Sequence, residues 1–399
     1  MKPELLAPAG DMECLETAIK FGADAVYLGG DFMQMRSSKV GFTRETLKNA
    51  IEYAHKYDKK VYVTVNCFAK NEELPKLRDY AKFLYDIGAD AAIISDIGAL
   101  SVMKEAVPQL NAHISTQANC TNWASARAYY NMGASRVVLA REMNIQEIRE
   151  LRENTPPELE IEAFVHGSMC MSYSGRCLIS SFLNNRSGNR GECTQPCRWN
   201  YYLVEQKRPN EFFEVVEDCG TTAILSSMDM NCIEFLDDIR DAGVCSFKIE
   251  GRMKTPYYVA TVVNAYRRRL DGFDDIEILK NELNFVSHRP YCTGFYFGDI
   301  QKNTFNDGLY HTDAKFIGVV KDYHNGVAEI EQRNAFSVGD KLEVLSPVSI
   351  GKSFTVEKII DSMGENVQIA KLVQEIVSVN TPFELHEGDI LRRKISTNA

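Results

Sequence analysis

The sequence lacks most of the short motifs by which enzymes are recognised. It contains no GxSxG nucleophile elbow, no HExxH zinc-binding pair, no Gly-rich phosphate loop and no GxGxxG dinucleotide fingerprint. Its seven histidines are scattered singly, which argues against a His-rich metal centre. The common serine hydrolases, zinc peptidases and nucleotide-dependent enzymes are therefore poor first hypotheses.

Long hydrophobic runs are also missing. No segment approaches the roughly 20 apolar residues of a membrane-spanning helix, and the apolar run near the first residue is too short for a signal peptide. Eleven cysteines, an odd number without an export signal, favour metal ligands or free thiols in a reducing cytoplasm. A net charge of −10 excludes a generally basic surface but allows a local basic patch. We expect a cytoplasmic protein with no membrane partner.

The sequence does hold an unusual segment of thiols and arginines between residues 162 and 198. Its four cysteines, spaced C-x6-C-x15-C-x3-C, are Cys170, Cys177, Cys193 and Cys197. Over residues 168–198, four arginines accompany them against the single acid Glu192: Arg176, Arg186, Arg190 and Arg198. Thiolates suit an iron–sulfur cluster or tetrahedral zinc. Buried free thiols are the alternative, but Cys193 and Cys197 lie among Arg, Asn, Gln and Pro, which is not core composition.

Short apolar runs alternate with amphipathic stretches along the first 250 residues. Eight runs are typical of strands, at residues 4–7, 25–29, 61–66, 91–95, 112–117, 136–140, 161–165 and 246–250. The helical patterns between them imply right-handed βαβ crossovers and a parallel sheet. Eight such units in about 250 residues predict a TIM-type (β/α)8 barrel. An open doubly wound α/β sheet is the alternative.

The same patterns predict two domains. The barrel, a catalytic domain, spans residues 1–272 and carries a Cys-rich insertion at about 168–230, before the eighth strand. Residues 273–315 form a linker. From residue 316 apolar residues alternate with period two between Asn-Gly and Gly-Asp turns, which predicts a small C-terminal all-β barrel over residues 316–399.

Polar residues at the ends of the predicted strands are candidates for an active site, because such barrels react at the C-terminal ends of their strands. The predicted catalytic residues are Gln117, Asn119, Arg141, Glu142, His166 and Arg252. Helix capping is the alternative role for some strand-end residues. A Cys170–His166 hydrolytic pair is conceivable, but a cluster would occupy Cys170, and no third residue is evident to orient the histidine. The cysteine segment follows the seventh strand directly and should border the same cavity.

Several stretches carry a resemblance to a known family. EAFVHGSMCMSYSGRCLISS resembles the signature of peptidase family U32, the collagenase-like proteases. STQANCTNWASARAYYNMGASRVVLARE, GECTQPCRWNYYLVE, SFKIEGRMKT and RPYCTGFYFG resemble its branch of tRNA 5-hydroxyuridine synthases, also described as prephenate-dependent tRNA uridine(34) hydroxylases. The likeness covers nearly the whole chain. One departure is SMDMNCI at residues 227–233, where many relatives read like SKDLC, so the role of Cys232 stays open.

This resemblance implies an oxygen-independent hydroxylation of wobble uridine 34 in the tRNA anticodon loop. It also implies prephenate as co-substrate and a [4Fe–4S] cluster held by the four cysteines. Arginine binds carboxylates bidentately, so Arg36 and Arg176 are candidates for this dicarboxylate, beside Arg141 and Arg252. Arg186 and Arg190 are the predicted RNA contacts, with Tyr173 stacking on a flipped base. A U32-type peptidase and a cluster-dependent hydroxylase of another small substrate are the alternatives.

Overall fold

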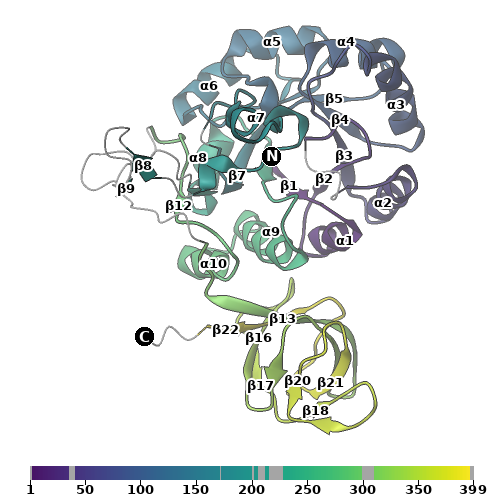
Figure 1. Ribbon diagram of the computed structural model, residues 1–399, viewed down its shortest axis with the longest axis vertical. Helices are drawn as coiled ribbons and strands as arrows, with labels where there is room; N and C mark the ends of the chain where they lie inside the picture. The colour runs from purple at the N-terminus through teal and green to yellow at the C-terminus, as the bar shows by residue number, and fades with distance from the viewer. Residues whose placement is uncertain are drawn as a thin grey trace. The chain divides into compact units, whose positions relative to one another are not determined.

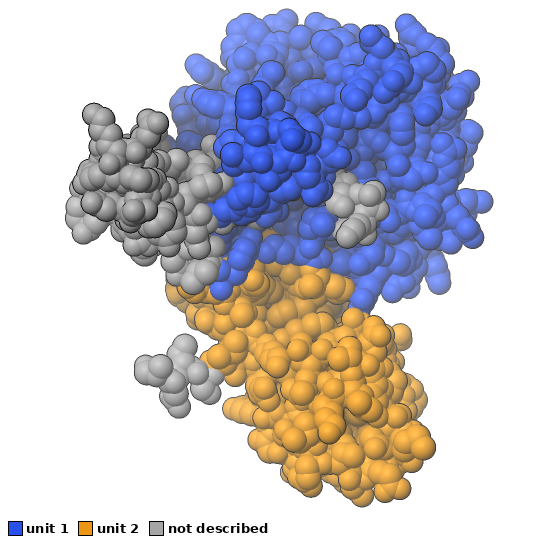
Figure 2. Space-filling model, in the orientation of Figure 1, with its two compact units in different colours: residues 1–19, 23–254, 289–310 blue, residues 20–22, 255–288, 311–399 orange. Residues whose placement is uncertain are grey.

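The computed structural model describes residues 2–35, 41–170, 172–199, 202–204, 212–214, 228–298 and 310–395. Its contacts divide the chain into two compact units, coloured separately in Figure 2. Unit 1 comprises residues 1–19, 23–254 and 289–310, and unit 2 comprises residues 20–22, 255–288 and 311–399. Within the described ranges, none of the helices is both long enough and apolar enough to span a membrane.

Unit 1 contains a closed parallel barrel, which confirms the predicted TIM-type fold. The barrel strands are β1 Glu4–Pro8, β2 Ala25–Gly29, β3 Lys60–Val65, β4 Ala91–Ile94, β5 Ala112–Ile114, β6 Arg136–Val138, β7 Glu160–Ser168 and β11 Ser246–Ile249. Neighbours pair in parallel in this order, and β11 pairs with both β7 and β1, which closes the ring. Nearly every strand residue is buried, as expected for strands covered on both faces.

Helices follow the strands and surround the barrel (Figure 1). They are α1 Met12–Lys20, α2 Arg44–Lys56, α3 Leu74–Asp86, α4 Ile97–Ala106, α5 Trp123–Asn131, α6 Ile145–Glu153 and α8 Leu236–Asp241. A polar residue caps the N-terminus of several of these helices. The Asp96 carboxylate, for example, accepts a hydrogen bond from the Ala99 backbone N–H at 2.8 Å. Capping therefore explains Asp96.

The long connection between β7 and β11 adds further elements. It holds α7 Ile179–Asn184, the 3-10 turns η2 Gly188–Arg190 and η3 Pro196–Arg198, and the strands β8 Tyr202–Val204, β9 Phe212–Glu214 and β10 Asp229–Asn231. Strand β10 pairs antiparallel with residues 166–168 at the end of β7, and β12 Tyr291–Cys292 pairs in parallel with β10. The barrel sheet is thus prolonged at this edge by strands from the insertion and from residues 289–310.

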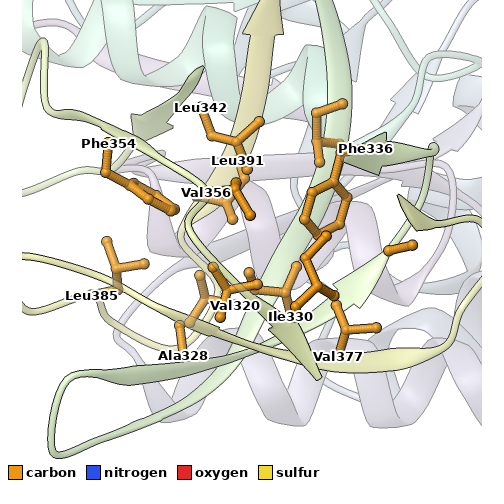
Figure 3. Packing of buried hydrophobic residues seen from close by; sticks show 14 of the residues in the cluster. Val320, Ala328, Ile330, Phe336, Leu342, Phe354, Val356, Val377, Leu385 and Leu391 are labelled. Carbon is orange, nitrogen blue, oxygen red and sulfur yellow. The ribbon is translucent and has the colours of Figure 1, made fainter. Parts of the chain in front are cut away.

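Unit 2 holds two helices and an antiparallel sheet. The helices are α9 Pro256–Leu270 and α10 Ile276–Leu283. The strands are β13 Ala314–His324, β14 Val327–Gln332, β15 Phe336–Ser337, β16 Lys341–Leu345, β17 Ser353–Thr355, β18 Ile359–Ile360, β19 Asn366–Val367, β20 Ile369–Ala370, β21 Ile376–Asn380 and β22 Ile390–Lys394. Eight of these strands form one sheet in the order β17-β16-β22-β13-β14-β21-β18-β19, a half-barrel curled around an apolar core (Figure 3).

The segment predicted as a linker, residues 273–315, contains α10 and β12. Contacts explain why α9 and α10 group with the C-terminal residues. The Tyr257 ring on α9 stacks on Phe316 with 5.2 Å between ring centroids. The Arg392 guanidinium on β22 donates to Glu282 on α10 at 2.6 Å. The two helices therefore contact strands β13 and β22 of unit 2.

Candidate functional site

A cavity of about 410 Å³ opens at the C-terminal ends of the barrel strands. Its walls include Thr64 on β3, Gln117 after β5, Arg141 after β6 and Arg252 after β11. The cysteine segment forms the remaining wall. Volume and position are typical of a small-molecule site in a TIM-type barrel.

All four cysteines of the segment line this one cavity: Cys170, Cys177, Cys193 and Cys197. Cys170 and Cys193 are exposed, and the other two are half-buried. The Gln195 backbone N–H donates to the Cys193 sulfur at 3.4 Å. Across the described ranges, no three His, Cys, Asp or Glu side chains lie close enough together to hold a metal ion. The donor set fits a cluster, and binding one requires the thiols to draw closer than they lie here.

Buried cysteines elsewhere are poor ligands by comparison. Burial raises the pKa of the Cys67 and Cys120 thiols to about 11 and that of Cys14 to about 12. Burial also raises the pKa of Cys232, which is fully buried. Because the thiolate is the metal-binding form, these four residues are expected to remain protonated core thiols.

The cysteine segment is fixed to the barrel by specific contacts. Glu142, after β6, accepts hydrogen bonds from the Ser174 backbone N–H at 2.8 Å and from its hydroxyl. Gly175 has φ +74°, and a Cβ at this position would lie 2.1 Å from the Gln117 carbonyl oxygen. Only glycine allows this approach without displacement. Glu142, predicted as catalytic, therefore positions the segment instead of lining the cavity.

The cavity wall is cationic although the chain is acidic overall. It includes four basic residues, Arg141, Lys248, Arg252 and Lys254, against one acid, Glu250. Arg141 pairs with Glu250 at 2.9 Å and lies 3.9 Å over the Phe164 ring. Arg252 donates to the Thr64 hydroxyl at 2.6 Å and to Gln34. This charge balance favours an anionic ligand.

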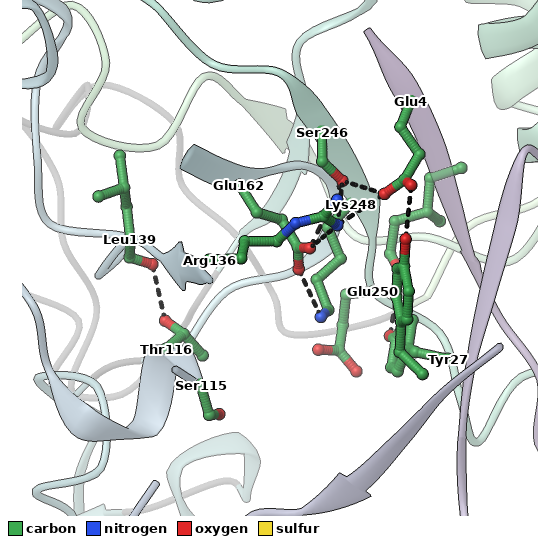
Figure 4. A network of polar contacts seen from close by, with 12 residues as sticks. Glu4, Tyr27, Ser115, Thr116, Arg136, Leu139, Glu162, Ser246, Lys248 and Glu250 are labelled. Atoms are coloured by element: carbon green, nitrogen blue, oxygen red, sulfur yellow. Dashed lines mark hydrogen bonds and ion pairs between the residues drawn. The ribbon is translucent and has the colours of Figure 1, made fainter. Parts of the chain in front are cut away.

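Lys248 joins the cavity to a buried ion network inside the barrel (Figure 4). Its ammonium is 2.7 Å from Glu162, which also pairs with Arg136 at 2.9 Å. Arg136 reaches Glu4 at 2.6 Å. Because β6 and β1 are not neighbours in the sheet, this contact crosses the barrel interior. None of these residues is among the predicted site residues. Glu4, Arg136 and Glu162 are each the one charge of an apolar run, whereas Lys248 shares its run with Glu250.

The structure brings some of the predicted site residues together at the cavity and separates others from it. Gln117, Arg141, Arg252 and Tyr173 line the cavity wall. Asn119 and Arg176 do not line it, and Arg36 lies outside the described residues. His166 is only 1% exposed, and its ring faces Tyr291 with 5.6 Å between ring centroids. His166 is therefore buried against Tyr291 of β12 and does not line the cavity.

The two arginines predicted to contact RNA differ in their surroundings. Arg186 is exposed, and no carboxylate in the described part of the chain forms an ion pair with it. Arg190 is half-buried and donates to Glu73 at 2.6 Å and to the Phe68 carbonyl at 2.7 Å. The hydrogen bond from Arg190 lowers the pKa of Glu73. Arg190 therefore ties the segment to the start of α3.

Fold and site together define a TIM-type barrel protein whose strand-end cavity has a wall of cysteines and a cationic lining. The model of peptidase family U32 matches residues 10–306, and that of the family's C-terminal domain matches residues 312–392. The chain belongs to peptidase family U32, as the sequence motifs predicted.

Named relatives of this chain include tRNA hydroxylation proteins and a collagenase. It is 36% identical over 403 residues to "tRNA hydroxylation protein P1" of Bacillus subtilis, covering 98% of this chain and 95% of the relative. It is 35% identical to "tRNA hydroxylation protein P" of Escherichia coli, covering 92% and 91%. It is also 33% identical to a "Collagenase" of Porphyromonas gingivalis, covering 87% of each.

Proposed function

We propose that this protein is a tRNA-modifying enzyme that hydroxylates wobble uridine 34 to 5-hydroxyuridine without molecular oxygen. Prephenate is the co-substrate, and a [4Fe–4S] cluster is held by Cys170, Cys177, Cys193 and Cys197. The observation that carries the proposal is one cavity that combines four thiols with a cationic wall. Relatives named for tRNA hydroxylation, at about 35% identity over almost the whole chain, support the choice of substrate.

The residues of the cavity serve two ligands, the dicarboxylate co-substrate and the nucleobase of the RNA. Arg141, Lys248 and Arg252 offer the guanidinium and ammonium groups that two carboxylates require. The Gln117 side chain can read the polar edge of a pyrimidine, and exposed Tyr173 offers a stacking ring at the cavity wall. When bound, the cluster supplies electron-transfer or Lewis-acid chemistry.

The relative named collagenase makes a peptidase the second candidate. A cysteine peptidase needs a thiol and an imidazole within hydrogen-bonding reach. Cys170 is exposed on the cavity wall, whereas His166 is buried and does not line the cavity. The geometry therefore favours the hydroxylase over a Cys–His peptidase.

Nucleoside analysis tests the proposal directly. In a strain that lacks the gene, tRNA digests analysed by mass spectrometry are expected to lose 5-hydroxyuridine and its derivatives. The wild-type gene should restore them and a Cys170→Ser copy should not. Anaerobically purified protein should form 5-hydroxyuridine in tRNA only when prephenate is supplied. Unchanged 5-hydroxyuridine in the deletion strain, together with peptide cleavage by the purified protein, would establish the peptidase instead.

The salt dependence of tRNA binding should separate Arg186 from Arg190. Each phosphate contact contributes roughly 0.7 to 0.9 to the slope of log affinity against log salt. We expect Arg186→Ala to reduce the slope by about that amount. Arg190→Ala should change it little, because Glu73 and the Phe68 carbonyl already engage its guanidinium. Filter binding across a salt series measures both slopes, and equal losses would contradict the assignment.

A further inference from the structure

Helix α7 and the residue before it present large apolar side chains to solvent. Phe182 is 82% exposed, and Leu178 and Leu183 are exposed as well, whereas Ser180 is only 1% exposed. A surface helix of a globular protein normally places its apolar stripe toward the core. The reversed arrangement leaves a large aromatic ring in water beside polar contacts that point inward. This outward surface of Leu178, Phe182 and Leu183 is called the α7 face below.

Hydrogen bonds hold the α7 face in place from behind. The Ser180 hydroxyl lies 3.0 Å from the Thr194 hydroxyl and accepts from the Thr194 backbone N–H at 3.0 Å. The Asn184 amide donates to the Thr194 hydroxyl at 2.8 Å. Thr194 follows Cys193, so the helix is fixed to the cysteine wall of the cavity. A ring on so constrained a support loses little conformational entropy on binding.

Positively charged side chains lie near the α7 face in the sequence and favour an anionic ligand. Arg176 and Arg186 flank the helix along the chain, and both are exposed. Neither forms an ion pair with a carboxylate in the described ranges. Ile179 at the start of α7 and the exposed Tyr173 ring both line the cavity. Arginines beside exposed rings are what unpaired nucleic acid needs, since phosphates meet the cations and bases stack on the rings.

We propose that the α7 face binds an unpaired RNA nucleotide adjacent to the one that enters the cavity, with its base stacked on Phe182 and a phosphate paired with Arg186. This inference rests on the proposed function, because it takes RNA as the substrate. It adds the site at which the nucleotides beside the modified base are held. Affinity at this site comes from stacking, which tolerates different bases.

Three substitutions of one residue test the site. Binding of the protein to a fluorescent anticodon stem–loop is measured by anisotropy. Phe182→Ala should weaken binding roughly 5- to 150-fold, the range for losing one stacked base. The Phe182→Leu protein should also bind the stem–loop weakly. The Phe182→Trp protein should bind within about twofold of the wild-type affinity, because of these replacements only tryptophan keeps an aromatic face. The salt slope should stay unchanged in all three, since no phosphate contact is lost.

The control is Tyr85→Ala, which removes an aromatic ring of 49% exposure from α3 of the same unit. It should bind the stem–loop like the wild type. If wild-type protein binds and hydroxylates tRNA but Phe182→Ala binds equally well, the α7 face is not an RNA site and the proposed function stands. If wild-type protein neither binds nor modifies tRNA, both fail. Normal binding by Phe182→Leu, or a dimer that Phe182→Ala dissociates, would assign the face to an apolar partner or a second copy.

Discussion

Serine in place of Cys170, Cys177, Cys193 or Cys197 should remove the iron and abolish tRNA hydroxylation. Anaerobically purified wild-type protein is expected to be brown and to contain about four irons per chain. Each single variant should fall below about one iron per chain, because a hydroxyl is a much weaker ligand for iron than a thiolate. Iron analysis and visible absorbance measure the loss. We expect all four cysteines to be required because their thiols line one cavity.

Cysteines of the barrel core provide matched controls. Cys67→Ser and Cys120→Ser should keep both colour and iron, because burial raises the pKa of both thiols to about 11 and leaves them protonated near neutral pH. Cys232→Ser should behave in the same way, which would decide the role of that residue. Loss of iron in these controls would place the cluster elsewhere. Colourless wild-type protein with one tightly bound zinc would contradict the prediction and show that the thiols hold a structural metal ion.

The strands of the barrel could be predicted closely because their sequences are simple. The run at residues 25–29 coincides with β2, and the run at residues 161–165 lies inside β7. Continuous burial leaves a continuous apolar pattern, which is readable without any partner. Strand β12 has only two residues and no periodicity, so the sequence predicts a linker there. Its existence depends on pairing with β10, which lies far away in the sequence.

The site was harder to predict than the barrel, because contacts between residues far apart in the sequence determine it. Cavity-lining residues such as Arg141 and Arg252 followed from their positions at strand ends. His166 has an equivalent position in sequence, but its ring is buried against Tyr291, and no local pattern shows which distant residues fold back onto a strand end. Arg190 is predicted as an RNA contact, but its guanidinium pairs with Glu73, which lies 117 residues earlier in the chain. Long-range pairing thus decided which predicted residues line the cavity.

Replacing Arg136 with methionine should destabilise the protein by roughly 3 to 5 kcal/mol, the range for removing one partner from a buried ion pair. The Arg136 guanidinium is 3% exposed and lies within 2.9 Å of the Glu4, Glu160 and Glu162 carboxylates. Without it, Glu162 keeps only Lys248 and Ser246 as hydrogen-bond partners inside the barrel. Chemical unfolding measures the loss. Arg240→Met, which breaks an exposed ion pair with Asp237, should cost less than about 1 kcal/mol.

The destabilisation should shrink in acid, and its direction follows from Glu4. Burial by itself raises the pKa of Glu4, but the charge of Arg136 and hydrogen bonds from Arg136, Tyr62 and Ser246 outweigh it, so the pKa lies below its ordinary value of 4.5. The ionised carboxylate therefore stabilises the wild type above about pH 4.5, and this contribution is lost as pH falls through the lowered pKa. In Arg136→Met the attraction is gone, and protonation of Glu4 relieves a buried charge instead. The difference in unfolding free energy between the two proteins should narrow from about pH 7 to about pH 4. A constant difference over this range would mean that Arg136 acts through packing and not through charge.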